Sequence, residues 1–442
     1  MSIRIPLKDL SDKDRVTLSQ KLCFYKKQSK YNKFQESEPI RPYSFDNSQN
    51  LYIPFHYGLK KFGSRYRRER KEFRKMNTSF SGQLRPLQQE VKKEALSLLN
   101  RRGCCLLSLY TGAGKTITSI YLACRINMPT LIIVHRLVLI KQWKESIEKV
   151  CKNPIVQVLG SKTELDPDAD FYIINAINAT KKHHGFFDTI GTLISDEVHV
   201  MATDKLSQSF YYIQPRYCIG LSATPYRSDG MDKLLHAYFS DKAVHRKLNR
   251  KHYVFKVDTG FVPEYDIGAN GKLDWNSVLA SQTSSIDRNE IILKIVKMFP
   301  ERNFLILSKR IDQVKYLVKK LMEAGESVTS LVGVKKFFNY SSRVLIATVQ
   351  KAGVGFDHPK LDTLIIASDV QEYFIQYLGR VFRRQDTVPI IFDLLDDFGV
   401  LKNHYYTRRK VYINHGGEVY KFSKKNVEKY TDITSYNQFF GD

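Results

Sequence analysis

The sequence predicts an α/β protein with two parallel-sheet domains, each with helices on both faces, and a small N-terminal α+β accessory module. From about residue 84, short apolar runs alternate with helical patterns, which is typical of parallel sheets. The alternation is interrupted around 240–275, where Gly260, Pro263, Gly268 and Gly271 fall, and then restarts. The first 75 residues are instead polar, basic and rich in aromatic residues. At 442 residues the chain is long enough for two or three domains.

The expected elements of the first domain follow its apolar periodicity. Residues 88–100 have helical spacing, with Val91, Ala95 and Leu98 on one face. Further helices are expected at 116–127 and 137–150, and strands at 104–110, 130–135, 155–159, 170–175, 192–196 and 217–222. Ligands of such sheets bind at the carboxyl ends of the strands, so we expect the functional residues there.

The second domain repeats this pattern after the interruption. Helices are expected at 287–298, 311–324, 373–382 and 396–410, and strands at 303–308, 343–348, 363–367 and 389–394. The expected organisation is an accessory module at 1–75, a first domain at 76–240, a linker at 241–275, a second domain at 276–410 and a basic tail at 411–442.

The composition narrows the class of protein. The chain has 70 Lys and Arg against 45 Asp and Glu, a formal net charge of +25 that predicts attraction to a polyanion. Its six cysteines form no C-x-x-C pair, so a reduced, intracellular protein without structural zinc is expected. There is no run of 18 apolar residues and no signal-like N-terminus, so neither secretion nor a membrane span is expected.

The N-terminal module ends in a basic run between Lys60 and Lys71. Cations interleaved with aromatic rings suit a nucleic-acid surface, where charges meet phosphates and rings stack on bases. In the alternative interpretation the rings form the core of the module and the charges make a solvated face. The sequence leaves both interpretations open.

A glycine-rich turn follows the first expected strand of the first domain. It reads Thr111-Gly112-Ala113-Gly114-Lys115-Thr116, and its backbone N–H groups can wrap a triphosphate. The Lys115 side chain can reach the β- and γ-phosphates, and the Thr116 hydroxyl can bind Mg²⁺. This turn predicts a nucleotide site.

An acidic pair follows a later strand of the same domain. Asp196 can hold the Mg²⁺ ion, and Glu197 can orient and deprotonate the attacking water. Together with the glycine-rich turn, the pair indicates a nucleoside-triphosphate hydrolase. The second domain has no glycine-lysine loop of its own, which suggests one nucleotide site shared by two domains.

In this order and spacing, the motifs resemble those of the superfamily 2 (DEAD/DEAH-like) helicases over residues 84–410. The resemblance implies two tandem RecA-like P-loop domains that use ATP and Mg²⁺. In Leu84-Arg-Pro-Leu-Gln88 it implies that Gln88 reads the adenine edge, with Arg85 beside the nucleotide. It makes Asp196-Glu-Val-His199 the acidic box, whose His199 couples hydrolysis to Ser222 and Thr224 of the Ser-Ala-Thr segment.

The resemblance extends to the second domain. It implies that Gly355 and Asp357 of Gly353-Val-Gly-Phe-Asp357 lie at the nucleotide, with Gln376 of Gln376-Tyr-Leu-Gly-Arg380. It also implies that Arg380 and Arg383 reach the γ-phosphate as arginine fingers, worth roughly 10³–10⁵ in rate. Arg384 is expected to be a phosphate-facing or solvated charge instead.

Nucleic-acid contacts are also implied by the resemblance. Arg136, after the second strand of the first domain, and Thr348 in the second domain are the candidates for gripping the backbone. The alternative for Arg136 is a surface charge at a helix N-terminus. Residues 175–180 depart from the threonine-rich contact of the family and leave that contact open.

Within the superfamily, the segments Ile140-Lys-Gln-Trp143 and Leu378-Gly-Arg-Val-Phe-Arg-Arg384 look most like those of one group. It contains duplex DNA translocases of transcription and repair, the transcript-release helicases of poxviruses, and phage branch-migration helicases. The resemblance implies an ATP-dependent DNA helicase or translocase acting on duplex or branched DNA, of viral or phage origin because the chain is compact.

The partners expected are nucleic acid, with DNA favoured over RNA, and transcription or replication proteins. A monomer is expected, in the host cytoplasm or nucleus or in the virion if the origin is viral. Two alternatives stay open: an RNA helicase, and an ATP-gated remodeler of a nucleic-acid–protein complex that separates no strands.

Overall fold

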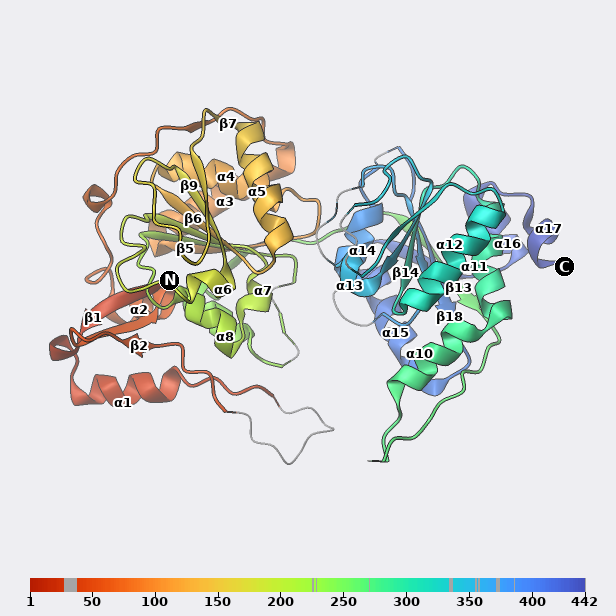
Figure 1. Ribbon diagram of the computed structural model, residues 1–442, viewed down its shortest axis with the longest axis horizontal. Coiled ribbons are helices and arrows are strands. Elements are labelled where there is room, and N and C mark those ends of the chain that lie inside the picture. The colour runs from red at the N-terminus through yellow and green to blue at the C-terminus, as the bar shows by residue number, and fades with distance from the viewer. Residues whose placement is uncertain are drawn as a thin grey trace. The chain divides into compact units, whose positions relative to one another are not determined.

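The computed structural model describes residues 1–27, 38–224, 226–227, 229–269, 271–333, 337–353, 356, 358–370, 374–384 and 386–441. The chain divides into two compact units, Met1–Arg246 and Lys247–Asp442. Each unit contains one seven-stranded sheet, and both sheets are visible in Figure 1. The strand pairs of both sheets are parallel, which confirms the predicted fold class.

The first sheet has the strand order β12-β5-β11-β10-β6-β9-β8. The strands are β5 (Cys104–Leu109), β6 (Thr130–Val134), β8 (Val156–Leu159), β9 (Phe171–Asn175), β10 (Thr192–Ser195), β11 (Tyr217–Ser222) and β12 (Ala243–Arg246). Those from β5 to β11 start and end within a residue or two of the predicted apolar runs. For β5, β6, β9, β10 and β11 the reason is that central strands are buried on both faces, whereas β8 is an edge strand. β10 lies between β6 and β11, and β11 lies next to β5, so the strands that precede the predicted motifs are neighbours.

Alternate side chains of these strands pack into two different clusters. Cys105, Leu107 and Ile132 face the helices α3 (Pro86–Arg102), α4 (Lys115–Ile126) and α5 (Leu137–Val150). Cys104, Leu106 and Leu131 face the opposite way, toward α9 (Asp232–Phe239) and the N-terminal residues. The period of two along each strand therefore divides the core between the two faces of the sheet.

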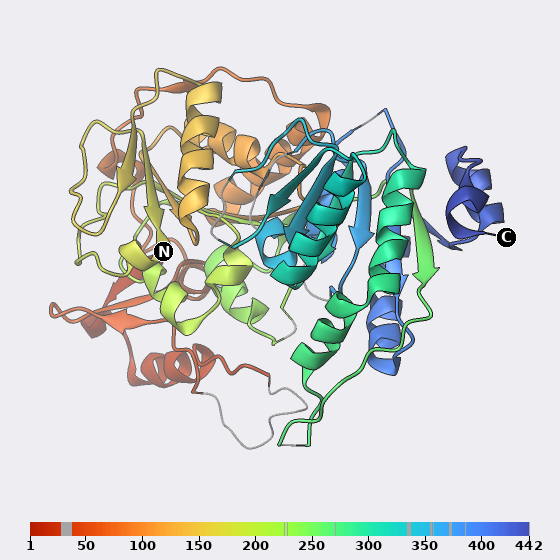
Figure 2. The same ribbon diagram turned by 45° about the vertical axis from the view of Figure 1, so that its right-hand side comes forward.

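The N-terminal residues form a small antiparallel sheet in the order β1-β3-β2. Its elements are β1 (Ser2–Pro6), β2 (Ser44–Phe45), β3 (Asn50–Pro54), α1 (Asp12–Lys21) and α2 (Phe55–Phe62). Ile3, Ile53 and Phe55 are buried in the same cluster as one face of the first parallel sheet. The predicted α+β module is therefore present, and its apolar residues pack on one face of the first parallel sheet (Figure 2).

Four arginines at the end of this module, Arg67, Arg68, Arg70 and Arg74, form what we call the arginine strap. Each guanidinium donates a hydrogen bond to a main-chain carbonyl of the first unit. The pairs are Arg67 with Arg216, Arg68 with Asp188, Arg70 with Ile126, and Arg74 with Ala169. These carbonyls precede β11, β10, β6 and β9, so the strap binds near the amino ends of the strands. Neither sequence interpretation of the basic run included this structural role.

Shorter elements complete the first unit. They are α6 (Ala176–Ala179), α7 (Val198–Met201), α8 (Asp204–Ser207) and the antiparallel pair β4 (Ser79–Phe80) and β7 (Cys151–Lys152). Within the described ranges, no helix combines the length and the apolarity needed to cross a membrane.

The second sheet has the strand order β15-β16-β14-β17-β18-β13-β19. The strands are β13 (His252–Asp258), β14 (Phe304–Ser308), β15 (Val328–Leu331), β16 (Val344–Thr348), β17 (Thr363–Ile366), β18 (Ile390–Leu395) and β19 (Gly417–Lys421). The helices are α10 (Trp275–Ser284), α11 (Ile286–Met298), α12 (Ile311–Glu323), α13 (Val349–Ala352), α14 (Phe374–Val381), α15 (Gly399–Asn414), α16 (Lys424–Thr431) and α17 (Tyr436–Phe440).

Two segments differ from the expected organisation. The range 241–275, expected as a linker with some strand, contributes a strand to each main sheet, β12 to the first and β13 to the second. The range 411–442, expected as a tail, contains β19, which pairs with β13. Each strand pairs with a partner distant in sequence, a contact that local composition does not encode.

Candidate active site

The glycine-rich turn connects the carboxyl end of β5 to the first residue of α4. Gly112 has φ +89° and Gly114 has φ +87°, a left-handed conformation that glycine adopts without steric cost. A Cβ atom at Gly114 would lie 2.3 Å from Nε2 of Gln88. Because α4 begins at Lys115, the N–H groups of its first turn are directed at the turn, as in anion-binding helix N-termini.

Side chains of the preceding helix contact this turn. Nε2 of Gln88 donates to the Gly114 carbonyl at 3.3 Å, and a guanidinium nitrogen of Arg85 donates to the Gly112 carbonyl at 2.9 Å. Oε1 of Gln88 accepts a hydrogen bond from the Arg85 N–H at 2.8 Å. Nζ of Lys115 donates to the Leu109 carbonyl at 2.9 Å. The structure therefore brings the predicted residues Arg85, Gln88 and Lys115 together at one loop.

The acidic pair stands at the carboxyl end of β10. The Asp196 carboxylate accepts the Glu197 N–H at 2.9 Å and the indole N–H of Trp143 at 2.9 Å. Burial and the charge of Glu197 raise the pKa of Asp196 to about 6, while the Trp143 hydrogen bond and Lys115 act in the opposite direction. Glu197 has φ +46°, so its backbone turns sharply into α7.

His199 joins the acidic pair to the neighbouring strand. Its Nδ1 lies 2.9 Å from Oγ of Ser222, at the end of β11, and 3.3 Å from Oε2 of Glu197. The Thr224 N–H donates to the same Ser222 hydroxyl at 3.0 Å. Burial lowers the pKa of His199 to about 4, so the ring is neutral near pH 7. The three predicted coupling residues, His199, Ser222 and Thr224, therefore form one hydrogen-bonded group, and the Glu197 carboxylate lies beside its histidine.

The donor set at these strand ends suits Mg²⁺. Thr116 offers a hydroxyl oxygen at the start of α4, and Asp196 offers a carboxylate close enough to Lys115 for the ammonium to lower its pKa. Oxygen donors of this kind, few in number and completed by phosphate oxygens, are what Mg²⁺ requires.

The predicted arginines of the second unit differ in their surroundings. Arg380, on α14, is buried; its guanidinium donates to the Phe356 carbonyl at 2.5 Å and lies 5.1 Å from the centre of the Phe356 ring. Burial lowers the pKa of Arg383. Arg384 forms ion pairs with Asp362 at 2.7 Å and Asp386 at 2.6 Å, so it is a structural charge.

The remaining predicted residues lie as follows. Gln376 is buried on α14. Thr348 is the last residue of β16 and is buried, and Arg136 caps the N-terminus of α5 and is exposed. Gly355 and Asp357 lie outside the described residues.

Two residues of the site were not among the predicted ones. Trp143 donates to Asp196, and Arg227 donates to the His199 carbonyl at 2.5 Å. Trp143 occurs at helical spacing in an apolar pattern, which indicates only a core position. Arg227 follows the Ser-Ala-Thr segment by three residues, and that proximity is the single signal in the sequence.

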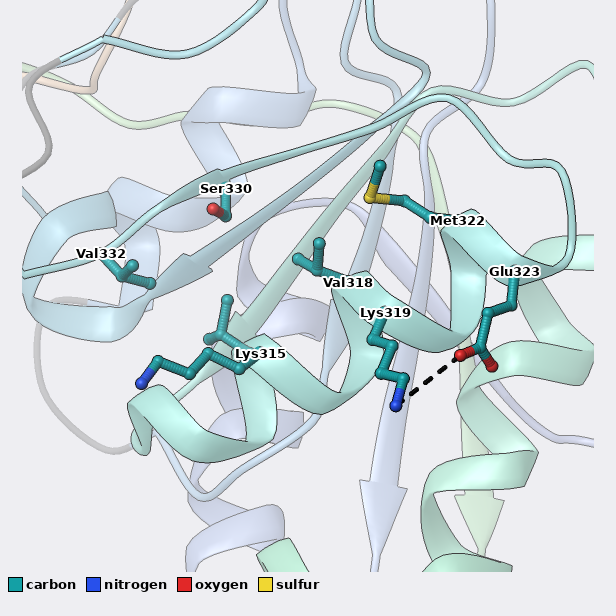
Figure 3. A pocket seen from close by; sticks show the side chains of 8 residues that line it. Lys315, Val318, Lys319, Met322, Glu323, Ser330 and Val332 are labelled. Carbon is teal, nitrogen blue, oxygen red and sulfur yellow. Dashed lines mark ion pairs between the residues drawn. The ribbon is translucent and has the colours of Figure 1, made fainter.

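A separate groove lies on the second unit beside α12 and the edge strand β15 (Figure 3). Its lining residues are Val314, Lys315, Val318, Lys319, Met322, Glu323, Ser330 and Val332. The ion pair of Lys319 and Glu323, 3.9 Å apart, lies at its rim. None of the predicted site residues lines it.

Comparison with known proteins agrees with this geometry. The family model described as "Type III restriction enzyme, res subunit" matches residues 81–227, which include every predicted motif of the first unit. "Putative helicase 161L" of Invertebrate iridescent virus 6 is 42% identical over 404 residues, covering 86% of this chain and 88% of that protein. "Putative helicase 055L" of Frog virus 3 is 32% identical over 380 residues, covering 84% and 86%.

A solved structure shares the fold. S. cerevisiae Dbp5 bound to RNA and ADP BeF3 superposes with a TM-score of 0.55 at 14% identity, covering 79% of this chain and 98% of that one. Two tandem parallel-sheet units with one glycine-lysine loop and one acidic pair define an ATP-dependent enzyme of the RecA-like class. The chain belongs to the superfamily 2 helicases, in the group that includes these iridovirus proteins.

Proposed function

We propose that this protein is an ATP-dependent DNA helicase or translocase that moves on, or remodels, duplex or branched DNA in viral transcription, recombination or repair. The observation that carries the proposal is the hydrogen-bonded group at the carboxyl ends of β10 and β11. There His199 contacts both Glu197, next to the site of hydrolysis, and Ser222 of the Ser-Ala-Thr segment. A change at the nucleotide would be transmitted through this group to the neighbouring segment.

In this proposal the first unit binds and hydrolyses ATP. Residues 111–116 cradle the phosphates, Lys115 leaves the Leu109 carbonyl to reach them, and Gln88 with Arg85 holds the adenine side. Mg²⁺, held by Thr116 and Asp196, would neutralise charge on the phosphate oxygens. Glu197 orients and deprotonates the attacking water.

The second unit would supply positive charge to the transferred phosphoryl group. Arg380 and Arg383 are the proposed arginine fingers, and Gln376 with Gly355 and Asp357 would contact the nucleotide. The burial of Arg380 and the lowered pKa of Arg383 accord with side chains held for use in an enclosed site. Hydrolysis would then depend on both units acting together.

Nucleic acid would be gripped at Arg136, which follows β6 of the first unit, and at Thr348, which ends β16 of the second unit. The net charge of +25 favours binding of a polyanion by either unit. DNA is proposed as the substrate because segments of both units, Ile140–Trp143 and Leu378–Arg384, resemble those of duplex DNA translocases.

The test is steady-state ATPase activity at fixed salt, without nucleic acid and then with single-stranded DNA, duplex DNA, branched DNA and RNA. We expect the strongest stimulation from duplex or branched DNA. Stimulation by RNA alone would make the protein an RNA helicase. An ATPase that none of these stimulates would indicate a remodeler that requires a protein partner.

The DNA grip has its own test. Arg136→Ala should weaken DNA binding and raise the concentration of DNA that half-stimulates hydrolysis, while basal ATPase stays unchanged. Lys141→Ala is the matched control, because it removes an exposed charge from the same helix α5. Equal behaviour of the two variants would remove Arg136 from the proposed grip.

A further inference from the structure

Trp143 lies at the centre of the buried face of α5. Leu139, Trp143 and Ile147 share this face, and the Trp143 side chain is 2% exposed. Its indole Nε1–H donates to Oδ2 of Asp196 at 2.9 Å. A buried indole N–H needs a hydrogen-bond acceptor, and here the acceptor is the carboxylate of a predicted metal ligand.

The hydrogen bonds to Asp196 fix the orientation of its carboxylate. Oδ1 accepts the Glu197 N–H, and Oδ2 accepts the indole N–H, both at 2.9 Å. An ionised carboxylate offers about four lone-pair directions, so acceptor capacity remains on both oxygens. The backbone donor alone would leave the second oxygen unrestrained by any described hydrogen-bond donor.

We propose that Trp143 is a positioning residue for the metal ligand Asp196. Its N–H holds the carboxylate in the rotamer that binds Mg²⁺, and it acts through Asp196 without touching the nucleotide. The inference rests on the proposed function, in which Asp196 holds the ion. Because Mg²⁺ demands near-octahedral geometry, a carboxylate free to rotate would bind it more weakly. Loss of a hydrogen-bond partner of this kind typically costs about 10–100-fold in metal affinity or activity.

The first experiment compares Trp143→Phe with Ile147→Val. Phenylalanine keeps an aromatic ring in the core and removes the N–H, whereas the control perturbs the same face of α5 without touching Asp196. The probe is Mn²⁺ in the presence of ADP, with free Mn²⁺ measured by electron paramagnetic resonance. We expect Trp143→Phe to weaken Mn²⁺ binding by about 10-fold or more and Ile147→Val to leave it unchanged.

The same pair of variants is then assayed for ATPase activity against Mg²⁺ concentration. The Mg²⁺ concentration for half-maximal rate should rise in Trp143→Phe, and saturating Mg²⁺ should restore much of kcat. A loss of kcat that Mg²⁺ does not restore, or Mn²⁺ binding equal to that of the parent, would overturn the proposal.

A second measurement needs no change at position 143. The chain has two tryptophans, so Trp275→Phe leaves Trp143 as its one fluorophore of this type. Emission from Trp143 should change when Mg²⁺ is added with ADP, and not with ADP alone. Unchanged emission would contradict the inference even if Trp143→Phe fails to fold. A parent protein without Mg²⁺-dependent ATPase activity would contradict the proposed function itself, which distinguishes the two failures.

Discussion

Replacing Arg67 by alanine should destabilise the first unit. The guanidinium donates two hydrogen bonds to the Arg216 carbonyl, at 3.1 and 2.9 Å, and lies 4.8 Å from the centre of the Tyr217 ring. A hydrogen bond from a charged group contributes about 1.5–3 kcal/mol, and a partly desolvated cation–π contact about 0.5–2 kcal/mol. Since both hydrogen bonds share one acceptor, we count them once and expect a loss of roughly 2–5 kcal/mol.

Differential scanning calorimetry measures this loss. For a unit of this size each kcal/mol lowers Tm by about 2–4 °C, so a decrease of roughly 4–20 °C is expected. We expect the transition of the first unit to be the one whose Tm rises when Mg²⁺ and ADP are added, because a ligand that binds only the folded state stabilises it. Arg65→Ala is the matched control, because its side chain is 69% exposed and its ion pair with Asp9 is 3.5 Å long. Such a surface change should stay within about 0.5 kcal/mol.

The reasoning would be refuted if Arg67→Ala melted like Arg65→Ala. If the basic run were instead a nucleic-acid surface, Arg67→Ala would weaken DNA binding without loss of stability. The slope of log affinity against log salt would then decrease by about one. Stability and salt dependence together therefore decide between a structural and a nucleic-acid-binding role.

Three substitutions test the site, and one pH dependence tests the burial of two histidines near it. Lys115→Ala should abolish hydrolysis while DNA binding, followed by fluorescence anisotropy, stays largely intact; loss of both would contradict the division of roles. Glu197→Gln should bind ATP but trap it unhydrolysed, so an unaltered turnover rate in a single-turnover assay would remove Glu197 from the mechanism. Arg383→Ala should lower kcat by about 10³-fold or more with little change in ATP affinity, as measured by kinetics and nucleotide binding. The pKa values of His199 and His135 are both lowered to about 4, mainly by burial, and this predicts that the free energy of unfolding falls in acid. These neutral rings stabilise the fold above about pH 6.5, the unfolded pKa, and their contribution is lost as the pH falls toward 4; denaturant titrations at several pH values should show this decline, and a flat profile would contradict the burial of these rings.

The motif-bearing elements could be predicted from the sequence because local signals and tertiary structure agree there. The run that becomes β5 is continuously apolar, and the glycines after it must adopt positive φ. The place of Gln88 at the nucleotide is implied by resemblance alone, whereas its hydrogen bond to the Gly114 carbonyl is seen in the structure. Short buried strands and tight turns impose constraints that are visible in a few adjacent residues.

Other features depend on partners distant in sequence. β13 lies in a stretch whose glycines and proline indicate a linker with some strand. It becomes a strand inside the second sheet because β18 and β19 pair with it on either side. Nothing in the sequence around the arginines of the strap distinguishes an arginine that binds a main-chain carbonyl from one that binds a phosphate. The helical spacing of Trp143 indicates a core position, and the residue is indeed buried. Its hydrogen bond to Asp196 depends on the packing of α5 on the sheet and has no local signal.

The N-terminal module has a practical consequence for dissecting this enzyme. Ile3, Ile53 and Phe55 are packed in one cluster with Leu106 and Leu131 of the first sheet. A fragment that begins at the first motif, near residue 84, would present that apolar sheet face to water and would be prone to aggregate. A minimal ATPase fragment must therefore retain these N-terminal residues. If their removal abolishes activity, aggregation must be excluded before the loss is attributed to DNA recognition.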